Sequence, residues 1–198
     1  MKSEEKASGE YPDLKVRGLI YGAVSRWTAE EFGEEKLEAF LKKLPDESKE
    51  ILRNYDKKEW YPAKDAYVIY ERLVSFLSSK MSEADVISGL VNFMFSQAVT
   101  GFMKGLMSFL TPARLTKRAT KFWLRVHSQG RIEYIDGKNN QFNVVLHDWS
   151  VHRTSCLIFA GWLKQLVEYT GAKNVKVSEV NCSLDSPDPC RWEVKYIT

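Results

Sequence analysis

The chain has 198 residues, of which 44% are hydrophobic and 28% are charged, a composition typical of a globular protein with a core of its own. Its 29 basic and 26 acidic residues give a net charge of +3 and are well mixed along the sequence, which argues against nucleic-acid binding. The densest basic cluster is interpreted as a solvated helix face and consists of Lys117, Arg118 and Lys121.

The first half of the chain is predicted to be helical. Residues 1–13 are a polar lead-in that we expect to be disordered. Apolar residues follow helical spacing from Val16 to Trp27, and Thr28 with Glu31 three residues later matches a capping box that would begin the next helix. Further helical runs are expected up to Pro45, over residues 51–55 and over residues 66–77.

A long apolar segment follows. Ser82 and Asp85 are expected to open it, and Thr111–Pro112 is expected to end it and to begin another helix. Residues 86–110 carry a single charge, but polar residues recur through them and membrane-type flanks are missing, so we interpret the segment as a buried helix. The start of the chain lacks the apolar region of a signal peptide, which predicts a cytoplasmic protein with reduced cysteines.

The second half is predicted to be an antiparallel sheet crossed by a helix. Residues 123–127 and 132–135 read as strands, Asp136–Gly137 as a hairpin turn, and residues 142–146 as the returning strand. A helix from Cys156 closed by Gly171 and two final strands complete the pattern. The predicted fold class is α+β, one integrated domain with a helical half (14–121) packed on a sheet half (122–198).

Three cysteines and a glutamate are the candidate metal ligands. Cys182 and Cys190 lie at the facing ends of the last two predicted strands, Glu179 lies three residues before Cys182, and Cys156 lies in the first turn of the preceding helix. If that helix packs beside the hairpin, four donors converge, as a closed structural zinc site requires. Cations expected to offset the negative charge of the site are Arg153 and Arg191. The spacing leaves two alternatives open, namely three buried cysteines or a Cys182–Cys190 disulfide.

The same residues carry a family resemblance. The stretch from Cys156 and Gly161 through Glu179 and Cys182 to Cys190-Arg-Trp resembles the C-terminal motif of vinyl-4-reductase-type domains. In the zinc-bearing members, which are sensor domains of aromatic-responsive bacterial transcription activators, the four matching positions are the metal ligands. The resemblance therefore implies that Cys156, Glu179, Cys182 and Cys190 hold a structural Zn²⁺.

The N-terminal half is similar to haem–nitric-oxide-binding domains, which share this fold. The similar segments are residues 18–20, 32–35 and 111–115, and the whole chain also resembles an uncharacterised myxobacterial family of about this length. The haem-binding group carries a histidine before the Thr-Pro element and a Tyr-x-Ser-x-Arg motif after it. This chain has no histidine between Met81 and Leu110 and no such motif, so no haem is expected.

The resemblance implies a pocket between the two halves for a small hydrophobic or aromatic ligand. Side chains predicted to line it are Phe95, Val99, Phe102, Met103, Met107, Trp123 and Tyr134, and their alternative role is plain core packing. His127, His147 and His152 are interpreted as structural or surface residues. No catalytic residue is assigned, because no nucleophile motif or phosphate-binding loop occurs.

The function expected from these features is that of a zinc-stabilised cytosolic sensor domain. It would bind a small apolar or aromatic molecule, form a homodimer and signal by protein contact. One alternative is an accessory protein or enzyme of tetrapyrrole reduction, although the sequence has no nicotinamide or flavin motif. The other is an interaction scaffold, because the fold is shared with subunits of a vesicle-tethering complex.

Overall fold

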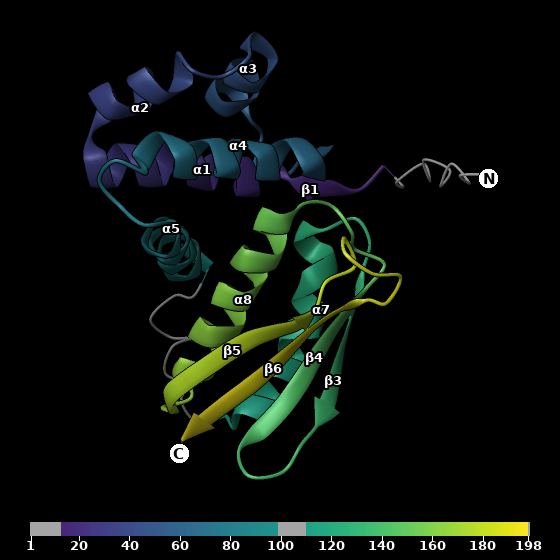
Figure 1. The fold of residues 1–198 in the computed structure, drawn as a ribbon. Helices are drawn as coiled ribbons and strands as arrows, with labels where there is room; N and C mark the ends of the chain where they lie inside the picture. Colours follow the sequence, from purple (N-terminus) through teal and green to yellow (C-terminus); the bar gives the residue numbers. More distant parts are fainter. Residues whose placement is uncertain (1–12, 99–109, 198) are drawn as a thin grey trace, which may run out of the picture.

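The structure, a computed structural model, describes residues 13–98 and 110–197. A helical part lies on one end of a part built from a sheet and two helices (Figure 1). The elements of the helical part are β1 (Lys15–Arg17), α1 (Gly18–Phe32), α2 (Glu34–Leu41), α3 (Asp46–Asn54), β2 (Trp60–Pro62), α4 (Ala63–Leu77) and α5 (Glu83–Ala98). Those of the second part are α7 (Pro112–Val126), β3 (Arg131–Asp136), β4 (Gln141–His147), α8 (Arg153–Glu168), β5 (Lys173–Asn181) and β6 (Cys190–Ile197).

The first long helix continues through the predicted capping box. Thr28 lies inside α1 and is fully buried, so the prediction that it begins a new helix is wrong. The helix ends instead at Gly33, whose φ of +87° is accessible to glycine at little cost. Residues 1–12 lie outside the described part of the chain, so the expected disorder of the lead-in stays a prediction.

The helix α7 begins as predicted but ends later. The Thr111 hydroxyl accepts a hydrogen bond from the Arg114 amide at 3.3 Å, and Pro112 occupies the first turn. The helix then runs to Val126, so the strand predicted over residues 123–127 is wrong, and the boundary expected after residue 121 falls inside α7. No glycine or proline interrupts the sequence between Pro112 and Gly130, so nothing local ends the helix earlier.

The sheet has the strand order β3-β4-β6-β5, and all its neighbours are antiparallel. The predicted hairpin is present, with Asn139 and Asn140 at positive φ in its turn. Alternate residues of β4 and β6 face inward in the opposed pairs Phe142–Val194, Val144–Trp192 and Leu146–Cys190, and all six are buried. The helix α8 covers this inner face over β5 and β6, and α7 packs beside it against β3 (Figure 1).

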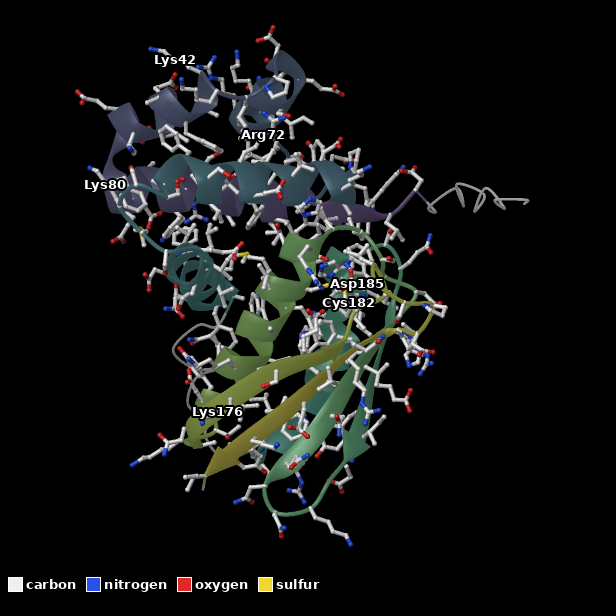
Figure 2. The ribbon with its side chains drawn as sticks, in the orientation of Figure 1. Lys42, Arg72, Lys80, Lys176, Cys182 and Asp185 are labelled. Atoms are coloured by element: carbon white, nitrogen blue, oxygen red, sulfur yellow. The ribbon has the colours of Figure 1, made fainter. Side chains whose placement is uncertain are left out.

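One hydrophobic core connects the two parts. It extends from Val16 in β1 through Tyr70 in α4 to Trp192 in β6, and α4 contacts α8 directly. The N-terminal end of α8 therefore lies next to α4, and the β5–β6 loop with Cys182 and Asp185 lies at the same end of the sheet (Figures 1 and 2). The observed class is α+β, as predicted. Among the residues described, no helix is long and apolar enough to cross a bilayer.

Candidate metal centre

The start of α8 is fixed by His152. Its imidazole Nδ1 accepts a hydrogen bond from the Thr154 amide at 3.2 Å, and its carbonyl accepts bonds from the Ser155 amide and hydroxyl at 2.9 and 2.7 Å. The other ring nitrogen lies 3.7 Å from the Glu71 carboxylate of α4. This capping places Cys156 in the first turn of α8, at the end of the helix nearest the helical part.

A β-bulge at Val180 brings Glu179 and Cys182 to the same face. Glu179 is opposite Trp192 and Asn181 is opposite Arg191, so Val180 is an extra residue in β5. In a regular strand, residues three apart point to opposite faces. The bulge reverses the alternation, so Glu179 shares the inner face with Trp192 and the next inward position after the bulge is Cys182.

The loop between β5 and β6 is held by Asn181. Its amide nitrogen donates to the carbonyls of Asp188 and Pro189 at 3.0 and 2.9 Å, and its amide oxygen accepts from the Ser186 hydroxyl at 3.0 Å. The amides of Asp185 and Ser186 both donate to the Cys182 carbonyl. These bonds close the loop so that Cys182 and Cys190 stand on facing strand ends.

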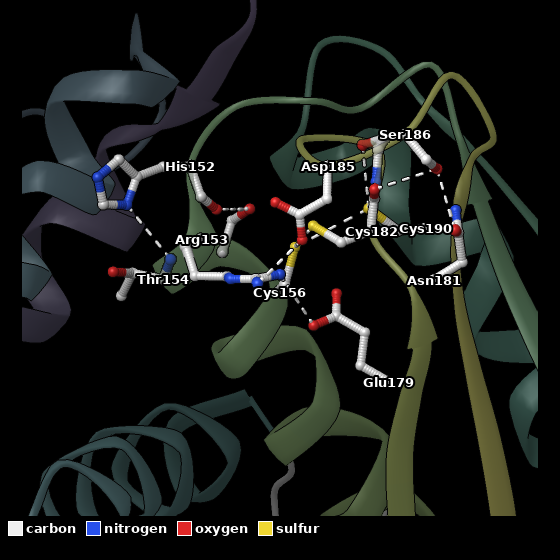
Figure 3. Close-up of polar contacts among 12 residues, drawn as sticks. His152, Arg153, Thr154, Cys156, Glu179, Asn181, Cys182, Asp185, Ser186 and Cys190 are labelled. Atoms are coloured by element: carbon white, nitrogen blue, oxygen red, sulfur yellow. Dashed lines mark hydrogen bonds and ion pairs between the residues drawn. The ribbon is translucent and has the colours of Figure 1, made fainter.

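The four predicted ligands converge at this place (Figure 3). The Sγ atoms of Cys156, Cys182 and Cys190 and a carboxylate oxygen of Glu179 all lie within 4.8 Å of one another. The Cys156 sulfur is 3.9 Å from each of the other two sulfurs. Two thiolates on one tetrahedral zinc ion, each about 2.3 Å from the metal, are about 3.8 Å apart, so these two sulfur separations fit a shared zinc ion.

The three cysteines are free thiols, and all three are buried, whereas Glu179 lies at the exposed edge. Because Cys182 and Cys190 are both free, the structure contains no disulfide between them. The donor set of three sulfurs and one oxygen matches the preference of zinc better than that of calcium or magnesium, which take oxygen ligands.

The pKa values of the three thiols differ, with that of Cys190 lowered and those of Cys156 and Cys182 raised. A bond from the Cys156 thiol, reinforced by the Ser183 hydroxyl and amide at 3.0 and 3.2 Å, lowers the pKa of Cys190 to about 6. The same contact with Cys190, together with burial, raises the pKa of Cys156, and burial raises that of Cys182. Cys190 is thus the most acidic of the three thiols, and a metal ion would displace the protons of the weakly acidic ones.

One arginine covers the outer side of the group. Arg153 lies 3.4 Å from the Glu179 carboxylate and 3.0 Å from that of Asp185, and the nearby Cys182 sulfur raises the pKa of its guanidinium. This cation would offset part of the formal charge of about −2 that three thiolates and a carboxylate would leave around a bound Zn²⁺. Arg191, predicted for the same role, is on the outer face of the sheet and bonds to Asn143 at 3.1 Å. That prediction is wrong, because Arg191 alternates with the inward Cys190.

The three predicted ligand-pocket residues that the structure describes are not gathered in one place. Phe95 packs against Trp162 and Tyr169 in a small cluster of its own. Trp123, on α7 instead of a strand, packs against Trp149 and Phe159, and the Tyr134 ring lies on Phe142. The remaining candidates lie outside the described residues and are Val99, Phe102, Met103 and Met107.

The histidines have structural contacts, in line with the sequence interpretation. His127 stacks on Trp123, and His147 contacts the Glu133 carboxylate at 2.8 Å. Sequence reasoning missed Asn181, Ser183 and the role of His152 as a helix cap. The polar Ser-Pro-Asp-Pro composition after Cys182 indicated a structured turn, but it did not indicate which side chain holds it.

Comparison with known proteins identifies the fold. No protein-family model and no curated protein matches the chain. Among solved structures, an H-NOX protein from Shewanella oneidensis in the Fe(II)NO ligation state superposes with a TM-score of 0.67 at 17% identity, covering 92% of this chain and 99% of the other. An unliganded Fe(II) H-NOX protein from K. algicida gives 0.64 at 9% identity, covering 92% and 97%. An oxygen-binding H-NOX domain related to soluble guanylate cyclases gives 0.60 at 10% identity, covering 92% and 95%.

These neighbours confirm the predicted relation to haem–nitric-oxide-binding folds and contradict the expectation of no haem. The solved structures that share the fold are H-NOX domains in Fe(II), Fe(II)NO and oxygen-bound states. The expectation rested on one missing histidine and one missing motif. Haem iron is also held by Cys, Met or Tyr, or by a histidine elsewhere, so those absences do not exclude haem.

Proposed function

We propose that the chain is a ligand-binding sensor domain whose sheet half is stabilised by a structural zinc ion held by Cys156, Glu179, Cys182 and Cys190. The observation that carries this proposal is the convergence of the four donor atoms within 4.8 Å from α8, β5, the β5–β6 loop and β6. A closed set of four protein ligands leaves no position for substrate, so the metal has a structural role and not a catalytic one.

The zinc ion would link the core helix to the free edge of the sheet. The strand β5 is an edge strand, joined by hydrogen bonds to β6 alone, and α8 lies across both. A metal bound to Cys156 on α8 and to both strand ends fixes the start of α8 relative to the loop. Because His152 at the same helix end faces Glu71 of α4, this end also connects the sheet to the helical part.

The sensor part of the proposal is supported by the shared fold and by unpaired buried polar atoms. The Thr28, Thr116 and Ser150 hydroxyls and the Trp149 and Trp192 indole nitrogens are buried and have no hydrogen-bond partner among the described residues. Buried polar groups are nearly always paired, so these groups are candidate contacts for a bound small molecule. The ligand we propose is a small apolar or aromatic molecule, as the sequence resemblance implies.

Haem is included among the ligands to be tested. Among the described residues, His127 is the buried histidine, and its burial lowers its pKa to about 3. The imidazole is therefore neutral at physiological pH, as coordination of iron requires. Its ring is stacked on Trp123 with a centroid distance of 3.5 Å, so coordination there requires Trp123 to move. Haem would supply a redox-active iron that binds diatomic gases.

Metal analysis of protein purified without a metal-affinity step tests the zinc proposal. We expect about one zinc ion per chain, as one closed site of four ligands requires. A Cys182→Ser variant should lose it, and a Ser178→Ala variant should retain it, because Ser178 lies opposite Glu193 on the outer face of the same strand. Metal-free wild-type protein that also fails to bind added zinc would refute the site.

Ligand binding is tested separately by titration with haem and by a thermal-shift screen of aromatic compounds. A ligand present at about 100 times its Kd adds about 2.7 kcal/mol of stability. For a domain of this size that raises Tm by roughly 5–10 °C. Absence of a haem absorption band and of any thermal shift would refute the sensor assignment while leaving the zinc site standing. Homodimer formation and cytoplasmic location stay predictions, the first to be measured by light scattering.

A further inference from the structure

The helix α7 carries an unusual charge. It contains five basic residues and, alone among the described helices, no acidic residue. Its five cations exceed the net charge of +3 of the whole chain, so the rest of the chain is net negative. The small excess of basic over acidic residues in the chain is therefore accounted for by this one helix.

Four of these cations form a row. Arg114, Arg118, Lys121 and Arg125 are spaced by four, three and four residues, which places them on one face of the helix, and all four are exposed. Within residues 13–98 and 110–197 none of them forms an ion pair, and residues 99–109 contain no acidic side chain. Like charges at this spacing destabilise a helix by roughly 0.2–0.5 kcal/mol per pair. No ion pair within the described residues offsets this repulsion.

Two large apolar side chains flank the row. Phe122 is 48% exposed and Leu124 is 59% exposed. Since successive residues are 100° apart around a helix, they lie on opposite sides of the row, and the Arg125 guanidinium rests over the Phe122 ring at 4.8 Å. The far side of the helix is anchored in the core by Leu115 and Trp123. The exposed face is therefore a fixed surface and not a fraying end.

We propose that this face of α7 (Arg114, Arg118, Lys121, Phe122, Leu124 and Arg125) docks an acidic amphipathic helix of a partner protein. From Arg114 to Arg125 the helix rises by about 16 Å, which matches three turns of a helix with carboxylates on one side. Three of its four cations are arginines, whose planar forks bind carboxylates bidentately. Phe122 and Leu124 would contact apolar residues beside those carboxylates.

A protein partner fits the geometry better than a lipid surface. A flat anionic bilayer would meet the row, but the two apolar side chains project to its sides and would not both insert. A partner helix packed along α7 has side chains on both of its sides, and these can contact Phe122 and Leu124. The inference goes beyond the proposed sensor function by locating the contact through which the domain would signal. It depends on α7 alone, so it can fail while the metal centre stands.

The test uses a synthetic helical peptide with Glu along one face and Leu on both sides of it. Binding to the full chain is measured by fluorescence anisotropy at low and at physiological ionic strength, beside vesicles containing phosphatidylserine. The double variant Arg118→Gln/Lys121→Gln should bind the peptide about tenfold more weakly. The control Lys42→Gln/Lys43→Gln removes the same charge from another exposed surface and should bind like the wild type.

A second pair of variants separates docking from charge attraction alone. Phe122→Ser/Leu124→Ser should weaken binding of the amphipathic peptide but not binding of polyglutamate, which has no apolar side chains. Equal losses in the Lys42/Lys43 control, or no peptide binding at all, would overturn the proposal and leave a solvated helix face. Tighter binding to vesicles than to the peptide would overturn it in favour of a lipid surface.

Discussion

Acid is expected to destabilise the fold through His127. This residue is 8% exposed, its ring is stacked on Trp123, and Trp149 contacts it edge-on at a centroid distance of 4.8 Å. Its Nδ1 lies 3.2 Å from the Trp123 carbonyl. Burial among these aromatic rings disfavours the charged imidazolium and lowers the pKa of His127 to about 3, from an ordinary value of about 6.5.

The sign and size of the effect follow from proton linkage. Below about pH 6.5 the unfolded chain binds a proton at His127 that the folded protein does not bind until about pH 3. The free energy of unfolding therefore falls as the pH is lowered through this window. Between pH 7 and pH 5 the expected loss from this residue is about 2 kcal/mol.

Urea unfolding at the two pH values measures this loss. A His127→Gln variant keeps a neutral side chain, so its loss between pH 7 and pH 5 should be smaller than that of the wild type by about 2 kcal/mol, whatever its stability at pH 7. A chelator is present in all samples, so that pH-dependent metal binding by the thiols does not contribute to the free energy of unfolding. Equal losses in the two proteins would refute the reasoning and show that the folded protein accepts the proton.

Two further predictions concern the metal centre. Glu179→Gln removes the anionic oxygen donor and the ion pair with Arg153, so zinc affinity measured by competition with a chromophoric chelator should fall by roughly tenfold or more, whereas Ser178→Ala should not change it. Unchanged affinity in Glu179→Gln would show that the carboxylate is not a ligand. Deletion of Val180 removes the bulge but leaves Glu179 and Cys182 two residues apart, so in a regular strand they should still share the inner face and zinc should be retained. Loss of zinc in the deletion variant would show that the shared face alone does not build the site.

Features encoded locally were predictable. The Ser82 hydroxyl bonds to the Asp85 carboxylate at 2.6 Å and accepts from the Asp85 amide at 3.2 Å, so it opens α5 as its sequence suggested. Thr111–Pro112 and the hairpin after Asp136 are equally short-range signals. The fold class followed from these elements, because their order separates a helical half from an antiparallel sheet.

Features that depend on distant packing were not predictable. Thr28 with Glu31 has the sequence pattern of a helix cap. Thr28 is nevertheless buried in the core, and α1 continues past it to end at Phe32, with Gly33 as the C-cap. The alternation of apolar and polar residues around Trp123 also fits a short strand. In the structure this segment is helical, and Trp123 packs against Trp149 and Phe159.

The ligand set of the metal centre was accessible for a different reason. The spacing of Cys156, Cys182 and Cys190 made convergence possible if the helix packed beside the hairpin, and the resemblance to vinyl-4-reductase-type domains supplied the full ligand set with Glu179. The supporting residues carried no such signal. Asn181, Ser183 and the bulge at Val180 act through backbone geometry, which a single sequence does not specify.

X-ray absorption at the zinc edge of the zinc-loaded protein tests the central claim most directly. The structure predicts about three sulfur ligands near 2.3 Å and one oxygen ligand near 2.0 Å, in tetrahedral coordination. A first shell composed of nitrogen and oxygen atoms, or one with fewer than about two sulfurs, would contradict the assignment of Cys156, Glu179, Cys182 and Cys190 as the metal centre.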